Sequence, residues 1–113
     1  MSAEPVRILF VCARNQWRSP TAEAIYRRDG RVKVRSAGVA SSARRTVKPN
    51  DLEWADWVVA MDDDHARRLK PMLRTLRRAP TLHTLGIPDD YRYMDPELID
   101  MIRRSVDALL DAS

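Results

Sequence analysis

The chain has 113 residues, 44% of them hydrophobic, which is enough for one buried core but leaves no length for a second. We therefore expect a single domain over residues 1–113. Its 20 basic and 16 acidic residues are interspersed, which excludes a strongly charged tail, and the formal net charge of +4 mildly favours acidic or phosphorylated partners. One cysteine excludes an internal disulfide framework. No secretion signal and no apolar run long enough to span a bilayer is recognisable, so we expect a soluble cytoplasmic protein without a membrane partner.

The N-terminal third predicts a strand, a polar loop, a helix and a second strand. The apolar run 8–11 is typical of a strand buried on both faces. Ser19 followed by Pro20 predicts a helix start with the serine as N-cap, because serine caps helices well and proline suits the first helical position. Good helix formers continue through 21–28, and the alternating residues 32–36 predict a second strand at the edge of a sheet.

The middle of the chain predicts a loop, a short helix and a third strand. Residues 37–49 lack periodicity and are typical of a connecting loop. Asn50, followed three residues later by Glu53, predicts a capping box that opens the short helix. The apolar residues 57–61 then predict a buried strand.

Two further helices and one strand complete the pattern. Aspartates at 62–64 favour a helix start because carboxylates stabilise the positive end of the helix dipole, and Pro71 kinks or ends that helix. Residues 81–85 predict a fourth strand, and Asp95 followed by Pro96 predicts the start of the last helix. Alternating strands and helices imply an α/β fold with a parallel sheet covered on both faces.

The loop between Cys12 and Arg18 is the candidate functional site. A loop that joins the carboxyl end of a parallel strand to a helix N-terminus presents several backbone N–H groups to one point, which makes an anion site. Arg18 has a planar fork of donors that can hold two phosphate oxygens. The same partial positive charges favour the thiolate of Cys12, the form that a nucleophile requires. The alternative is an inert buried cysteine, but Arg18 and the helix start favour the functional interpretation.

The residues around this loop form a longer pattern. Ile-Leu-Phe-Val precedes and Thr-Ala-Glu-Ala follows the run Cys12-Ala13-Arg14-Asn15-Gln16-Trp17-Arg18-Ser19-Pro20. This pattern resembles the signature of the low-molecular-weight protein tyrosine phosphatase family, in its short bacterial form. Further similarity covers residues 35–38, 51–62 and 87–91. The resemblance implies a three-layer sandwich whose four-stranded parallel sheet has the strand order 2-1-3-4, with helices on both faces.

The resemblance also implies roles for individual residues. Cys12 is the nucleophile that forms a phosphocysteine intermediate, and Arg18 with the loop amides stabilises the phosphate oxygens. Asp89 is the general acid, with Asp90 as the alternative, because the family's usual Asp-Pro-Tyr is here Asp89-Asp90-Tyr91. Other residues expected around the phosphate are Ala13, Arg14, Asn15, Gln16, Trp17, Ser19 and Tyr91. Ser19 is expected to hydrogen-bond the Cys12 thiolate, and Asn15 to hold the loop in shape because asparagine tolerates the left-handed conformation.

The resemblance implies no metal and no organic cofactor. The expected ligands are inorganic phosphate or a related oxyanion in the loop, and a phosphorylated protein or a small phosphomonoester as substrate. Nucleic acid is not an expected partner.

Three departures from the family's pattern concern the walls of the pocket. Arg14 stands where the family usually has glycine, and it either binds an acidic substrate or points into solvent. Trp17 replaces a cysteine that could protect the nucleophile as a disulfide. The segment 37–50 is shorter than in typical members, which predicts a shallower or differently walled pocket. Candidate aromatic surfaces are Trp17, Tyr91 and Tyr93.

Three functions remain open on the sequence. The first is a cysteine-dependent phosphatase acting on phosphotyrosine or a related phosphomonoester. The second is an arsenate reductase, which would need an external thiol because the chain has no second cysteine. The third is a non-catalytic module that binds phosphate or a phosphoprotein. Together, Cys12, Arg18 and Asp89 favour the phosphatase, since binding alone needs neither a thiol nor an acid.

Overall fold

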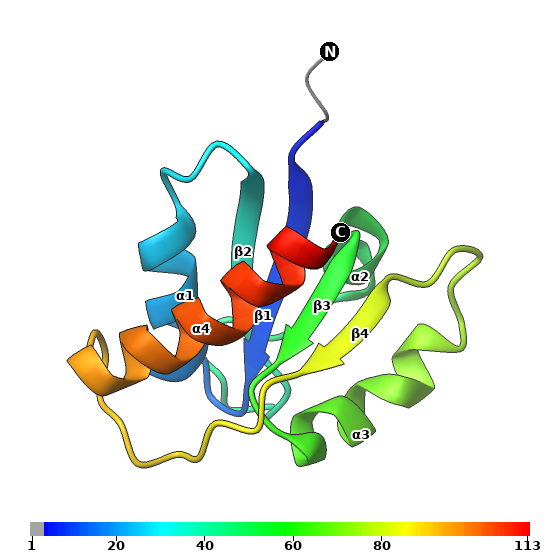
Figure 1. Cartoon of the computed structure of the whole chain (residues 1–113). Helices are drawn as coiled ribbons and strands as arrows, with labels where there is room; N and C mark the ends of the chain where they lie inside the picture. Colours follow the sequence, from blue (N-terminus) through cyan, green and yellow to red (C-terminus); the bar gives the residue numbers. More distant parts are fainter. Residues whose placement is uncertain (1–3) are drawn as a thin grey trace.

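The computed structural model describes residues 4–113, along which strands and helices alternate (Figure 1). In chain order the elements are β1 (Val6–Cys12), α1 (Arg18–Tyr26), β2 (Val32–Gly38), α2 (Pro49–Trp54), β3 (Trp57–Ala60), α3 (Asp63–Leu73), β4 (Thr81–Thr84) and α4 (Pro96–Ala112). The predicted succession of elements is confirmed. Every helix in residues 4–113 lacks the length and apolar character that crossing a bilayer requires.

The strands form one parallel sheet in the order β2-β1-β3-β4, which confirms the order implied by the family resemblance. In the central strand β1, Ile8 pairs with Val34 of β2 on one side and with Trp57 of β3 on the other. Strand β2 lies at the edge, as its alternating pattern predicted. Because β1 has a strand on each side and helices over each face, its residues 8–11 are completely buried.

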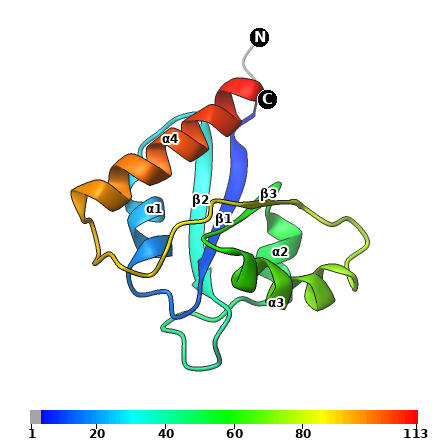
Figure 2. The same ribbon diagram turned by 60° about the horizontal axis from the view of Figure 1, so that its bottom comes forward.

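Two hydrophobic cores lie on opposite faces of the sheet. Side chains alternate along a strand, so Ile8 and Phe10 point to one face and Leu9 and Val11 to the other. The first pair packs with residues of α1 and α4, and the second with residues of α2 and α3. Figure 2 shows these two pairs of helices on either side of the strands. Cys12 continues the face of Ile8 and Phe10, which directs its side chain toward α1.

The predicted start of the first helix was wrong by two residues. Helix α1 begins at Arg18, and its N-cap is Trp17, which makes no side-chain capping bond. Ser19 lies inside the first turn, and its hydroxyl is within hydrogen-bond distance of the Cys12 thiol instead of capping the helix. A tertiary contact has replaced the local one that the sequence suggested.

The predicted capping box of α2 was also wrong. The N-cap is Lys48, and the carboxylate that accepts its amide at 3.1 Å belongs to Asp51, not to Glu53. Asp51 is buried, and it also accepts hydrogen bonds from Arg35 and Arg45 at 3.3 and 2.7 Å. The two arginines favour Asp51 as the capping residue, because their positive charges compensate for the burial of its carboxylate.

The remaining boundaries differ little from the predictions. Strand β2 continues to Gly38, which pairs with Cys12, while β3 and β4 each end one residue early. Asp95 caps α4, as predicted. Asp62 lies at the predicted start of α3, and the structure shows that it caps this helix by accepting the His65 amide at 3.1 Å. Helix α3 passes through Pro71 and ends two residues later.

Candidate active site

The candidate site lies where the carboxyl ends of three neighbouring strands meet (Figure 1). Loop 13–17 joins β1 to α1, Asp62 follows β3, and the segment 85–89 follows β4. Ligand sites of open parallel sheets lie at this edge, beside the strand where the direction of winding reverses. Here that strand is β1, because its sequence neighbours β2 and β3 lie on opposite sides of it.

Loop 13–17 is held from outside by the segment that follows β2. Four consecutive carbonyls, that of Cys12 at the end of β1 and those of residues 13–15 in the loop, accept hydrogen bonds of 2.9–3.1 Å from residues 39–44. Asn15 has φ of 55°, the left-handed conformation that asparagine tolerates better than most residues. The amides of residues 14–17 find no acceptor among residues 4–113, so these donors remain available to a bound oxyanion.

A chain of hydrogen bonds links the Cys12 thiol to a carboxylate. Cys12 Sγ lies 2.9 Å from Ser19 Oγ, and Asn15 Nδ2 donates to both Ser19 Oγ and Ser36 Oγ at 3.0 Å. The Ser36 hydroxyl in turn donates to Glu23 Oε1 at 2.6 Å. Each asparagine N–H therefore fills an acceptor position on a serine and leaves that serine's own hydrogen to donate onward.

This arrangement determines what the Ser19 hydroxyl can do. Its hydrogen has two acceptors within reach, Cys12 Sγ at 2.9 Å and the Ala37 carbonyl at 3.4 Å. Cys12 and Ser19 are both almost completely buried. A buried hydroxyl that donates to sulfur stabilises the thiolate more than the thiol, because a charged acceptor makes the stronger hydrogen bond.

Arg18 is also buried, with only 3% of the residue exposed. Its Nη1 donates to the Ile87 carbonyl at 2.8 Å and to Asp62 Oδ2 at 3.2 Å. Its Nε is 3.7 Å from Asp89 Oδ1 and makes no hydrogen bond within residues 4–113. The guanidinium is thus fixed on one side while a buried donor still lacks an acceptor, which a phosphate oxygen can supply.

Asp62 holds the Arg18 guanidinium, and His65 in turn contacts Asp62. Burial would raise the pKa of Asp62, but hydrogen bonds from the His65 amide and Arg18 hold that pKa below its usual range. Burial lowers the pKa of His65 despite the neighbouring Asp62 carboxylate. The pair is therefore a carboxylate beside a neutral imidazole near pH 7, and Asp62 stays charged opposite Arg18.

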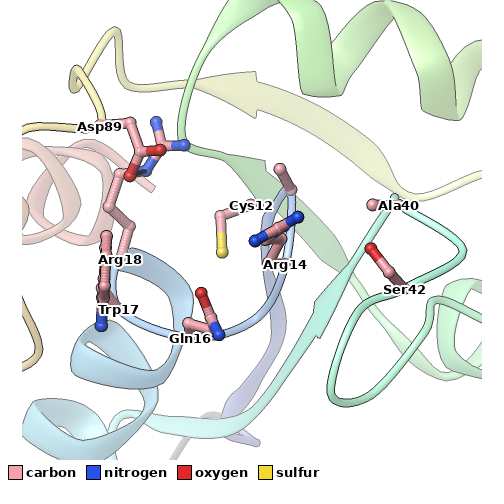
Figure 3. A pocket seen from close by; sticks show the side chains of 9 residues that line it. Cys12, Arg14, Gln16, Trp17, Arg18, Ala40, Ser42 and Asp89 are labelled. Carbon is pink, nitrogen blue, oxygen red and sulfur yellow. Dashed lines mark ion pairs between the residues drawn. The ribbon is translucent and has the colours of Figure 1, made fainter.

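A cavity of about 500 Å³ opens over this loop (Figure 3). The Cys12 sulfur points into it, with Arg18 and Asp89 together on one side and Arg14 on the other. The residues that line it are Cys12, Ala13, Arg14, Gln16, Trp17, Arg18, Ala40, Ser42 and Asp89. Most of the site residues predicted from the sequence thus line one cavity.

Some of the sequence candidates do not line this cavity. Asn15 and Ser19 lie beneath the loop, where they orient it and the cysteine. Tyr91 is not in the wall, because it packs half-buried against the core cluster under α4. The alternative acid Asp90 is likewise not among the lining residues, whereas Asp89 is.

Sequence reasoning missed several residues that shape the site. Ala40 and Ser42 form the wall opposite Arg18, and nothing in their irregular segment indicated where their side chains would lie. Asp62 was predicted only as part of a helix start, although its second oxygen holds Arg18. In residues 4–113, His, Cys, Asp and Glu side chains do not gather in threes as a metal site would require.

Comparison with known proteins gives a consistent result. Residues 7–54 match the family model described as "Low molecular weight phosphotyrosine protein phosphatase". No match was found among curated protein sequences. The chain therefore has the fold of the low-molecular-weight phosphatases, and the family resemblance of its sequence is confirmed.

Similar solved structures cover nearly the whole chain. A low-molecular-weight protein tyrosine phosphatase from Bacillus subtilis is 27% identical, with a TM-score of 0.66, and the match covers 92% of this chain and 97% of that one. SP-PTP from Streptococcus pyogenes is 18% identical with a TM-score of 0.76, covering 95% and 92%. The YwlE arginine phosphatase from Geobacillus stearothermophilus is 24% identical with a TM-score of 0.68, covering 96% and 95%.

Proposed function

We propose that the protein is a cysteine-dependent phosphatase that hydrolyses phosphotyrosine or a related phosphomonoester through a phosphocysteine intermediate. The observation that carries the proposal is the position of Cys12 Sγ, which points into the cavity 2.9 Å from the Ser19 hydroxyl, with Arg18 and Asp89 on the same cavity wall. The chain shares its fold with known phosphatases, which supports the proposal.

The geometry suits an in-line displacement at phosphorus. The Cys12 thiolate attacks the phosphorus atom, while the loop amides and Arg18 hold the three oxygens that do not react. Asp89 protonates the leaving oxygen, and then accepts a proton from the water that hydrolyses the phosphocysteine. We assign this role to Asp89 and not to Asp90 because only Asp89 lines the cavity.

An aryl phosphate is the substrate class that the walls favour. Trp17 is 41% exposed and lines the cavity, so its ring can pack against an aromatic leaving group. Arg14 and Arg18 make the cavity cationic, which disfavours a substrate with its own guanidinium group, such as phosphoarginine. Inorganic phosphate is then a competitive ligand of the loop. Because the thiol must stay reduced, we also place the enzyme in the cytoplasm.

The test is turnover of a substrate panel by matched variants. The panel contains 4-nitrophenyl phosphate, a phosphotyrosine peptide, a phosphoserine peptide and phosphoarginine. Cys12→Ser should abolish turnover of all of them while still binding phosphate. Arsenate with an added thiol tests the reductase alternative. Metal-independent hydrolysis that survives in Cys12→Ser would refute the proposal, and phosphate binding without any turnover would indicate a binding module.

A second pair of variants tests the general acid. Asp89→Ala should lower kcat for the phosphotyrosine peptide by about 10²-fold or more, since the tyrosine oxygen leaves poorly without a proton. The loss should be smaller with 4-nitrophenyl phosphate, whose leaving group needs less protonation. Asp90→Ala is the matched control and should retain normal kcat. The opposite ranking of the two variants would exchange their roles.

A further inference from the structure

A second cavity adjoins the candidate active site. Its volume is about 410 Å³, and it shares Gln16 with the cavity over the phosphate loop. Its wall combines the loop and α1, the segment after β2, and the segment before α4, with the lining residues Gln16, Pro20, Glu23, Arg27, Arg44 and Tyr93. The phosphatase mechanism uses none of the last four directly.

The wall of this second cavity is cationic. Arg27 and Arg44 form no ion pair with any carboxylate of residues 4–113, in contrast to Arg31, whose guanidinium contacts aspartates. Arg44 Nε donates to the Asn15 carbonyl at 3.1 Å, which fixes this guanidinium beside the phosphate loop. The carboxylate in the wall, Glu23, already accepts the Ser36 hydroxyl at 2.6 Å. Two arginine side chains there are available to an anionic group from outside.

Exposed large hydrophobic side chains also lie around the two cavities. Trp17, Tyr93 and Met94 are the exposed large hydrophobic residues of the described chain, at 41%, 53% and 39% exposure. Trp17 lines the first cavity and Tyr93 the second. Exposed apolar side chains that gather around a cleft are typical of a surface that binds another polypeptide.

Hydrogen bonds hold the backbone at two of these exposed hydrophobic residues, Trp17 and Met94. The Thr21 hydroxyl donates to the Trp17 carbonyl at 2.6 Å and accepts the Met94 amide at 2.9 Å. Met94 has φ of 62°, a left-handed conformation that few residues adopt without a tertiary contact to hold it. Thr21 therefore ties the segment that carries Tyr93 to the start of α1, next to the phosphate loop.

We propose that the second cavity binds an acidic side chain of a polypeptide substrate, one that flanks the phosphorylated residue held over Cys12. This inference rests on the proposed phosphatase function and narrows its substrate to acidic phosphopeptides. A small phosphomonoester fills only the first cavity. A glutamate or aspartate on a peptide that crosses Gln16 reaches Arg27 and Arg44, while the peptide backbone lies against Trp17 and Tyr93.

Binding of labelled phosphopeptides to the Cys12→Ser variant tests the proposal without depending on turnover. The peptides share one alanine-rich sequence with a central phosphotyrosine, and a single glutamate is moved through the positions on either side. At the position that reaches the second cavity, glutamate should tighten binding roughly three- to fivefold over alanine, as expected of partly exposed charge pairs. Lysine at the same position should weaken it, and raising the salt from about 0.1 M to about 0.5 M should remove the difference.

A matched pair of variants distinguishes the effect of the second cavity on binding from the effect of net charge. In the Cys12→Ser background, Arg27→Glu should remove the preference for glutamate, and Arg27→Lys should keep most of it. Arg28→Glu makes the same change of charge one residue further on, outside both cavities, and should keep the preference. Affinity that is independent of the glutamate position, or an equal loss in Arg27→Glu and Arg28→Glu, would overturn the proposal.

The same peptides, given to the wild-type enzyme, separate the two hypotheses. Turnover without any preference for glutamate would refute the acidic subsite and leave the phosphatase function standing. A glutamate preference in binding with no turnover of any peptide would support the subsite and refute the phosphatase.

Discussion

Replacing Gly38 with alanine tests whether the end of strand β2 determines the position of the phosphate loop. A Cβ at this position would lie 2.5 Å from the Ala13 carbonyl oxygen, 2.6 Å from Ala43 Cβ and 3.0 Å from the Asn15 amide nitrogen. The first and last of these atoms belong to the backbone of the loop, so no side-chain rotation can relieve the contacts. The loop or the strand must move.

The magnitude follows from this geometry. Overpacking of a tight site costs about 1–3 kcal/mol, and three contacts at or below 3.0 Å place Gly38→Ala toward the upper end of that range. The catalytic loss should be greater, because a shift of about 1 Å in reacting groups can cost about 10²-fold in rate. We expect kcat/KM for 4-nitrophenyl phosphate to fall by about that factor, with weaker inhibition by phosphate.

Gly30→Ala is the matched control. No heavy atom lies within 4 Å of a Cβ at Gly30, and its backbone is not in the left-handed region. This substitution should leave kcat/KM unchanged and alter the free energy of unfolding by about 1 kcal/mol or less, in the stabilising direction. Urea unfolding and steady-state kinetics measure both effects. Normal stability and normal kcat/KM in Gly38→Ala would refute the proposed contact between β2 and the loop.

Two further predictions concern the residues behind Arg18. Asp62→Asn keeps a cap for α3 but removes the charge that faces the buried Arg18, so kcat/KM should fall roughly tenfold. The free energy of unfolding should also fall, by about 1–3 kcal/mol, because a hydrogen bond between charged groups is lost. Unchanged kinetics would show that the Ile87 carbonyl alone holds the arginine. Burial lowers the pKa of His65 below the ordinary value of 6.5. On acidification the unfolded chain therefore takes up a proton that the folded chain resists, and stability falls. His65→Gln should reduce the loss of stability between about pH 7.5 and about pH 5.5 in urea unfolding, and an equal loss in both proteins would contradict this.

Much of the fold was predictable because its signals are local. Apolar runs such as 57–61 and caps such as Asp62 and Asp95 depend on neighbouring residues alone, and a parallel sheet follows from the alternation of strands and helices. The two errors at helix starts have the opposite cause. Ser19 contacts Cys12, and Asp51 pairs with arginines outside its helix, so distant partners outweighed the local preference.

The same division applies to the site. The candidate anion-binding loop could be predicted from the sequence alone, because Cys12, Arg18 and the amides between them are contiguous and need only a strand-to-helix turn to face one point. The distant groups around that loop become known only from the folded chain, since Asp62, Ser42 and Asp89 follow different strands.

The two tyrosines near the site show why the tertiary structure was needed. The sequence named both Tyr91 and Tyr93 as candidate aromatic surfaces, and it placed Tyr91 around the phosphate as well. An irregular segment has no period from which to deduce the direction of either side chain. In the structure Tyr91 packs against the core, whereas Tyr93 lines the second cavity. The contact between Met94 and Thr21, a long-range hydrogen bond, holds the segment in this orientation.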